Sequence, residues 1–196
     1  MNSLDVAVLA DGRPVIAAAQ SNGDFRYVEC LNVACSDSEM VSVDLTLDST
    51  TAAVEIGPNG LPFLAYYDDG ELSAVACHDT GCRDRVMTSI GEATGGGCGS
   101  VRPSIAFLPD GNPMITYWAP RALMLAECTS AACTEATVDI FANVRTYELA
   151  VLPNGSPVMT YFTYSEQEAP LAEDACCPPA DLRVATCTSG SCVGID

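Results

Sequence analysis

Eleven cysteines are the residues of this sequence most able to carry out chemistry. Eight of them form four pairs, which we call the clasps, with four residues between the two cysteines of each pair. Redox-active pairs usually have two intervening residues at a helix start. Zinc sites join Cys pairs to further His or Cys ligands, whereas here every pair has the same x4 spacing, each pair stands apart from the others and the chain has one histidine. The spacing therefore predicts four disulfides and an oxidising extracellular or periplasmic environment. The clasps are Cys30/Cys35, Cys77/Cys82, Cys128/Cys133 and Cys187/Cys192.

Three further cysteines lie outside the clasps: Cys98 in a glycine-rich stretch, and the adjacent Cys176 and Cys177 in an acidic insertion. Because three is an odd number, at least one of them must stay free, bind a metal or bridge to another molecule. We expect Cys98 to pair with one of the two adjacent cysteines and the other to link two chains. The sequence leaves the choice between the two open.

Other catalytic or metal-binding groups are sparse. His78 is the only histidine and directly follows Cys77, so we expect it in an exposed loop. A Ser-His-Asp or Cys-His arrangement would have to be built around this one side chain. Asp68, Asp69 and Glu71 form the densest acidic cluster and are candidate calcium ligands, although no spaced Asp-x-Asp-x-Asp-Gly loop surrounds them. A solvated turn is the alternative, so we expect a non-enzymatic protein without an obligatory cofactor.

The clasps recur together with a turn, and this repeat indicates how the chain positions them. Four segments read Asp or Asn, Gly, any residue and Pro, and an apolar run follows each. Asp-Gly and Asn-Gly favour tight hairpin turns because such turns require positive φ. A short apolar strand precedes each turn, and another strand ends at the first cysteine of each clasp. The turns are Asp11-Gly12-Arg13-Pro14, Asn59-Gly60-Leu61-Pro62, Asp110-Gly111-Asn112-Pro113 and Asn154-Gly155-Ser156-Pro157.

One repeat thus holds four strands in about 45 to 50 residues, the length and strand number of a β-propeller blade. The predicted fold is all-β, with a single domain over residues 1–196 that forms a β-propeller of four repeats, each of four antiparallel strands. Each clasp would close the turn between the third and fourth strands. Four blades could close a ring alone or form half of a larger ring. The approximate blade boundaries are 1–50, 51–100, 101–145 and 146–196.

The repeats differ at two places. Aromatic pairs follow three of the turns, where the first repeat has Ala18-Ala19, so we expect aromatic cores between blades and a different neighbour, or none, for the first blade. Only four residues follow Cys192, so we predict a last blade that lacks its fourth strand. Its open edge could pair with another chain, or the blade could simply be short. The aromatic pairs are Tyr66-Tyr67, Tyr117-Trp118 and Tyr161-Phe162.

The four Asp/Asn-Gly-x-Pro turns and the four clasps together resemble a known family. The chain is similar over nearly its whole length to the cysteine-bearing repeats of roughly fifty residues found in secreted bacterial proteins. This resemblance implies propeller-like blades and a bacterial, secreted or cell-surface protein. It carries no set of catalytic residues to this chain.

Charge and hydropathy restrict the partners. The chain has 26 acidic and 8 basic residues and a formal charge of −18, so nucleic acid and anionic membranes are poor partners. No apolar stretch is long enough to span a membrane. The N-terminal segment lacks the basic and apolar regions of a signal peptide, which suggests a mature or excised part of a longer precursor.

These observations lead to three hypotheses about function. The first is a secreted, non-enzymatic structural or binding module that self-associates as a homo-oligomer or polymer, for example in an extracellular assembly or filament. The alternative is a monomeric propeller that binds a glycan or a protein through its loops. The third is a carbohydrate-active enzyme, which would need two acids that face one central pocket.

Overall fold

The computed structural model describes residues 3–20, 24–44, 51–93, 102–119, 122–142, 144–164, 180–188 and 191–195. These ranges form β-strands that pair in four antiparallel sheets, one for each repeat, in the order of the chain. The all-β prediction and the division into propeller blades are therefore confirmed. The described residues contain no helix long and apolar enough to cross a membrane.

Each blade has four strands in sequence order, from the innermost to the outermost. The first blade has β1 (Ser3–Val8), β2 (Pro14–Ala19), β3 (Phe25–Cys30) and β4 (Ser38–Asp44). The second has β5 (Ala52–Ile56), β6 (Pro62–Asp68), β7 (Glu71–Cys77) and β8 (Arg85–Glu92). The third has β9 (Ser104–Phe107), β10 (Pro113–Ala119), β11 (Ala122–Cys128) and β12 (Ala136–Ala142). The fourth has β13 (Val144–Val151), β14 (Pro157–Tyr164), β15 (Ala180–Thr188) and β16 (Ser191–Ile195).

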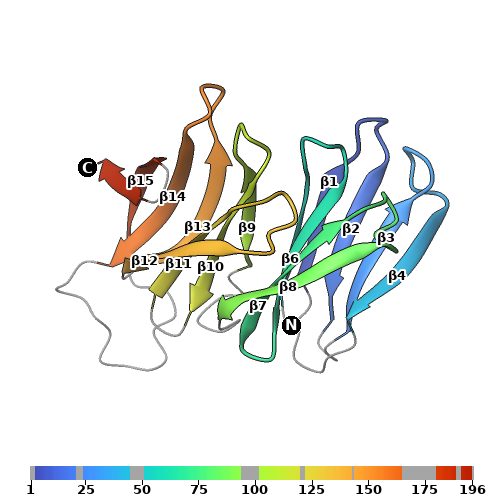
Figure 1. The fold of residues 1–196 in the computed structure, drawn as a ribbon, viewed down its shortest axis with the longest axis horizontal. Helices are drawn as coiled ribbons and strands as arrows, with labels where there is room; N and C mark the ends of the chain where they lie inside the picture. The colour runs from blue at the N-terminus through green and yellow to red at the C-terminus, as the bar shows by residue number, and fades with distance from the viewer. Residues whose placement is uncertain are drawn as a thin grey trace.

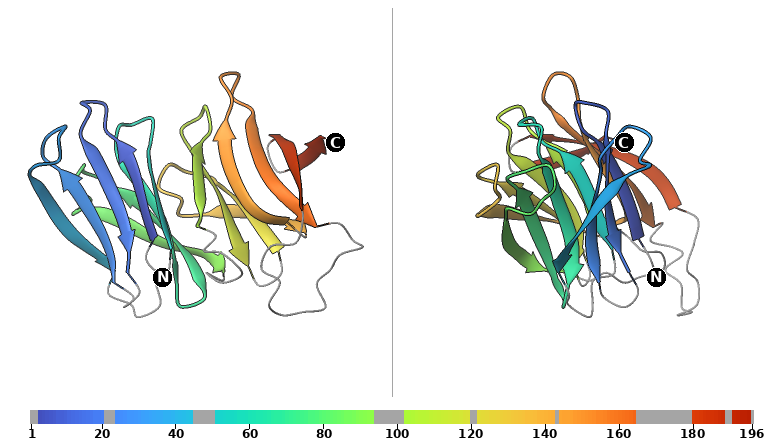
Figure 2. Two further views of the ribbon diagram at one scale, coloured as in Figure 1. Left: turned by 180° about the vertical axis from the view of Figure 1, so that it is seen from behind. Right: turned by 90° about the vertical axis from the view of Figure 1, so that its right-hand side faces the viewer.

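The blades stand side by side in a row. The inner strands contact each other in sequence, β1 with β5, β5 with β9, and β9 with β13. Figures 1 and 2 show the first blade and the fourth blade at opposite ends of this row. Of the two alternatives, the four blades thus resemble part of a larger ring rather than a ring closed on itself.

The repeated turn between the first and second strands of each blade is built as the sequence predicts. Gly12 has a φ of 87°, and its amide donates to the carbonyl of Leu9. The side chain of Asp11 accepts a hydrogen bond from the amide of Arg13 at 3.1 Å. Asn59, Asp110 and Asn154 make the same contact in the other three turns. The proline then begins the next strand, where a missing amide donor costs least.

The prediction that the last blade lacks its fourth strand is wrong. Residues Ser191–Ile195 form β16, which pairs antiparallel with β15. In the other blades the outer strand begins several residues after the clasp, whereas here Cys187 and Cys192 face each other across a hairpin. The chain therefore needs fewer residues beyond the clasp to complete the sheet. β16 has 5 residues, compared with 7 in β4 and 8 in β8, so the last blade is smaller but not open.

Three apolar clusters fill the spaces between consecutive blades. Tyr66 is buried between the first and second blades, with its ring centroid 4.4 Å from that of Phe25. Tyr67 and Tyr117 are buried between the second and third blades. These three aromatics occupy the expected core, whereas Phe162 of the fourth blade is 38% exposed.

Candidate functional site

Three clasps are disulfides with one shared geometry. Cys30–Cys35, Cys77–Cys82 and Cys128–Cys133 each close a turn in which the second cysteine has a left-handed φ of 49°, 52° and 50°. In each turn the amide of the second cysteine donates to the carbonyl three residues earlier. A left-handed non-glycine residue costs on the order of 1 kcal/mol, so the covalent ring holds a conformation that the residue does not favour. Disulfides of this kind indicate an oxidising environment.

Removal of the second blade's clasp, by the double change Cys77→Ser and Cys82→Ser, is expected to lower the free energy of unfolding by about 2 kcal/mol. The loss follows from the loop entropy of a six-residue ring. Urea unfolding of the variant and the wild type measures it. The matched control is Cys30→Ser with Cys35→Ser, which should cost less because Cys35 is only partly buried whereas Cys82 is fully buried. An unchanged urea midpoint for the first variant would contradict the prediction.

The remaining cysteines are only partly placed. Cys98, Cys176 and Cys177 lie outside the described residues, so their pairing stays a prediction. The backbones of Cys187 and Cys192 pair directly across β15 and β16. Their side chains lie outside the described part of the structure, and the fourth disulfide also stays a prediction.

The calcium candidates lie on a tight hairpin between β6 and β7. Asp68 pairs with Glu71, and the two turn residues Asp69 and Gly70 have φ values of 42° and 84°. The carboxylate of Glu71 accepts a hydrogen bond from the hydroxyl of Ser89. Within the described ranges no group of three or more His, Cys, Asp or Glu side chains is placed to hold a metal ion. Calcium binding here and its alternative, a solvated turn, both stay predictions.

His78 lies in the clasp loop of the second blade. Its side chain is about half exposed, and its Nδ1 is 3.5 Å from a carboxylate oxygen of the exposed Asp84. Its amide donates to the carbonyl of Asp84, which closes the loop. The histidine thus lies in the loop position expected from the sequence.

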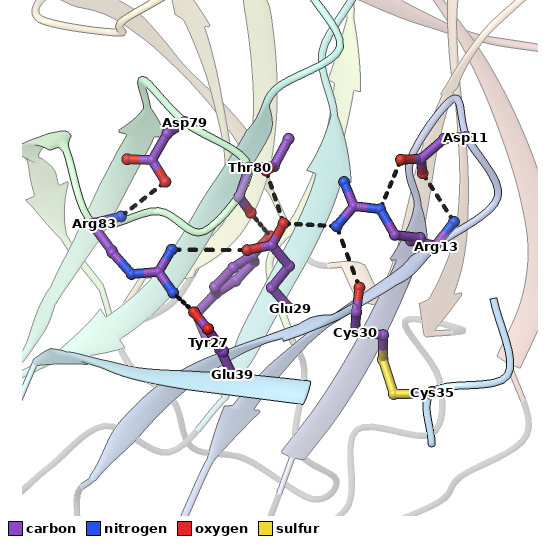
Figure 3. A network of polar contacts seen from close by, with 10 residues as sticks. All are labelled: Asp11, Arg13, Tyr27, Glu29, Cys30, Cys35, Glu39, Asp79, Thr80 and Arg83. Carbon is purple, nitrogen blue, oxygen red and sulfur yellow. Dashed lines mark hydrogen bonds and ion pairs between the residues drawn. A yellow bond between two sulfur atoms is a disulfide. The ribbon is translucent and has the colours of Figure 1, made fainter. Parts of the chain in front are cut away.

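A buried carboxylate that the sequence reading missed joins the first and second blades (Figure 3). Glu29 of β3 accepts hydrogen bonds from Arg13 at 2.9 Å and from Thr80 of the next blade's clasp loop at 2.8 Å. The guanidinium of Arg83 lies 3.8 Å from its second oxygen. Phe25, Tyr27 and Glu29 alternate along one buried face of β3, so an acid at an inward-facing strand position was the available signal.

The charges around Glu29 affect neighbouring groups. Burial raises the pKa of Tyr27 well above its ordinary value, and the nearby carboxylate of Glu29 adds to this shift. The Tyr27 hydroxyl donates to the carbonyl of Thr80, which ties the two blades together a second time. The hydrogen bond from the Arg13 side chain lowers the pKa of Asp11. The network is therefore an ionic contact between blades, with its groups paired to each other.

Two hollows are candidate ligand sites. One, of about 90 Å³, lies at the inner strands and is lined by Asp5, Arg102 and Glu148 among others. Two of its three acids have side-chain partners, because Asp5 pairs with Arg102 at 2.6 Å and Glu148 accepts the hydroxyl of Ser104 at 3.0 Å. The third is Glu55, whose pKa is raised by burial. The volume of the hollow is below the ~300–1,000 Å³ typical of small-molecule sites. Three acids thus line this space, but it is small for the ligand that the enzyme hypothesis requires.

The second hollow lies between the second and third blades. Its volume is about 300 Å³, and its lining includes Leu61, Phe63, Phe107 and Ala131. The side chains that line it are mainly apolar, with Cys77 already in a disulfide. None of the described residues in its lining is an acid or a histidine.

The outer faces of the two terminal blades carry uncovered apolar side chains. The first end face is one side of the first sheet, as the register of its strands shows, and Val6 on this side is 60% exposed. The last end face is the outward side of the fourth sheet, and Leu182 in it is 63% exposed. The first end face is Leu4, Val6, Val8, Ile16, Val28 and Met40. The last end face is Val158, Thr160, Phe162, Leu182 and Val184.

Equivalent positions in the other blades are buried. Val54, one repeat after Val6, is 3% exposed because it packs against the first blade. Leu72 and Leu123 stand where Leu182 stands in the fourth blade, and both are fully buried. Each end face therefore has the composition of an interface between blades but has no blade against it among the described residues.

Comparison with known proteins agrees with the fold. No family model matches the sequence, and no curated protein matches it. A Dyadobacter fermentans protein of unknown function is similar at 10% identity and a TM-score of 0.63, over 98% of this chain and 63% of that chain. Hydrazine synthase from Kuenenia stuttgartiensis is similar at 14% identity and a TM-score of 0.61, over 93% and 49%. A PL25 ulvan lyase is similar at 10% identity and a TM-score of 0.61, over 96% and 56%.

These similarities at low identity show the fold alone. The chain spans between about half and two thirds of the length of these three structures. Its four sheets are blades of the β-propeller type, and they match part of each larger protein.

Proposed function

We propose that this chain is a secreted, non-enzymatic structural module that associates with copies of itself through its uncovered blade faces. The observation that carries the proposal is the contrast between Val6 and Leu182, which are more than half exposed, and their equivalents Val54, Leu72 and Leu123, which are buried. Apolar patches of this kind on a soluble protein mark interaction sites. A repeat protein needs neighbours, or polar caps, for its terminal faces.

Other features support the proposed location and the proposed absence of catalysis. The three disulfides support a protein that works outside the reducing cytosol. The two hollows support a structural role, because one is small, with two of its three acids paired, and the other is mainly apolar. The acidic charge suits a soluble assembly that does not bind nucleic acid.

Sedimentation velocity of the oxidised protein tests the proposal. We expect the average mass to rise above 20.5 kDa as the concentration increases from about 1 to about 100 μM. The rise should be larger at high salt, because salt screens the repulsion between chains that each carry a charge of −18.

A variant in which Cys98, Cys176 and Cys177 are all changed to Ser separates the end faces from disulfides between chains. We expect this variant to associate as the wild type does, because the end faces contain none of these cysteines. A mass of 20.5 kDa for the wild type at every concentration and salt level would reject the proposal.

A further inference from the structure

Every interface between blades in the chain joins two different kinds of face. One face of each sheet, the leading face, packs on the following blade, and the other, the trailing face, packs on the preceding one. Between the first and second blades, Phe25 and Tyr27 belong to the leading face, and Val54 and Tyr66 belong to the trailing face. The second and third blades meet in the same way, with Leu72 on the leading face and Ile115 on the trailing face.

The two end faces are one of each kind. Val6 occupies the position of Val54, so the first end face is a trailing face. Leu182 occupies the position of Leu72, so the last end face is a leading face. We propose that the first end face of one copy docks on the last end face of a second copy, in the arrangement that consecutive blades adopt within the chain. This inference rests on the proposed function and specifies its contact.

Side-chain sizes at the two end faces are complementary. At the first interface a small leading residue, Ala19, accompanies a large trailing one, Tyr66. At the docked interface the sizes would be reversed, because the leading face presents Phe162 and the trailing face presents Ala18. The first repeat has Ala18-Ala19 in place of an aromatic pair, and the small side chain of Ala18 leaves room for the aromatic side chain of the last blade.

A polar contact of the inner strands also continues across the proposed interface. The carboxylate of Asp5 accepts the amide of Val54 in the next blade at 2.9 Å. At the interface between the third and fourth blades, the hydroxyl oxygen of Ser104 accepts a hydrogen bond from the amide of Leu149 at 3.1 Å. The fourth blade has Glu148 at this acceptor position, and the first blade has the amide of Val6 at the donor position. A carboxylate has lone pairs for several donors, so Glu148 can accept Val6 of a second copy while it keeps Ser104.

Contact between different faces either closes a ring or continues as a filament. Two copies supply eight blades, which is within the usual range of about four to eight for propellers. A closed ring of two chains, with two identical docked interfaces, is therefore the expected product.

A mixing experiment with Val6→Lys and Leu182→Lys tests the contact. Each change places a charge in one end face and leaves the other intact, and we expect each variant alone to associate about a hundredfold more weakly than the wild type. An equimolar mixture should regain association, because the intact last face of the first variant can dock on the intact first face of the second. Sedimentation velocity should then detect a 1:1 pair of chains that is absent from either variant alone.

Ile140→Lys is the matched control. Ile140 is 72% exposed on β12, outside both end faces, so the same substitution should leave association unchanged. Thermal unfolding of all three variants at a low concentration checks that they fold.

Failure of the mixture to associate overturns this inference without touching the proposed function. If one variant associates as the wild type does, two identical faces meet and the head-to-tail contact is wrong, although association through the end faces stands. If both associate as the wild type does, the contact lies elsewhere, which also rejects the role of the uncovered blade faces in the proposed function. A monomeric wild type rejects the proposed function together with the inference.

Discussion

The change Tyr66→Ala should lower the free energy of unfolding by about 4 kcal/mol. The side chain is fully buried between the first and second blades, and its ring lies 4.4 Å from that of Phe25. Truncation removes a large apolar group and leaves a cavity bounded by two sheets that cannot close on it. Urea unfolding of the oxidised variant and wild type, monitored by circular dichroism, measures the loss.

Phe162→Ala is the control for this prediction. Phe162 belongs to the aromatic pair of its own repeat but is 38% exposed on the last end face, so its truncation should cost less than about 1 kcal/mol in the monomer. Equal losses for the two variants would show that the blade interfaces do not determine stability in the way described. The pair of variants thus separates a filled interface from an unfilled one.

The change Glu29→Ala is expected to cost about 3 kcal/mol. It leaves Thr80 without its acceptor and Arg13 without its buried partner, at an interface between two blades. This loss of stability is at the low end of the range for breaking a buried ion pair, because Arg13 is partly exposed and keeps its ion pair with Asp11. Urea unfolding again gives the value.

Two further variants test the cause. Glu39→Ala removes an exposed acid that also pairs with Arg83, and it should change stability by less than about 1 kcal/mol. Glu29→Gln keeps an acceptor for Thr80 but loses the charge, so it should fall between the wild type and Glu29→Ala. A loss for Glu39→Ala as large as that for Glu29→Ala would attribute the effect to the charge of Arg83 rather than to the buried bridge.

The local features of the blades were predictable from the sequence because their causes lie within a few residues. Gly12 and its three equivalents take positive φ beside an Asp or Asn that accepts the amide two residues later. An alternation of apolar and polar residues marks the strand that ends at the first cysteine of each clasp. The strand predicted at residues 25–30 is β3. Three clasps form disulfides because two cysteines at this spacing can meet across a single turn.

The last strand shows where this local reasoning stops. β16 begins at Ser191, within the clasp, because the hairpin that pairs Cys187 with Cys192 turns earlier than the other clasps do. The number of residues beyond the clasp did not reveal this register. A register depends on which backbone groups pair across the turn, and a one-residue difference reverses the face of every side chain.

Short-range patterns alone thus define the four repeats, their turns, the spacing of their clasps and every strand except the last. Only the tertiary structure decides which faces are filled and which are open, because each interface joins residues about fifty positions apart in neighbouring repeats. Glu29 meets Thr80, 51 residues away, although nothing within either strand requires it. Val6 and Val54 have the same residue type and the same place in their repeats, yet one is exposed and the other buried. The difference lies in the neighbouring blade, which packs against Val54, whereas no blade among the described residues packs against Val6.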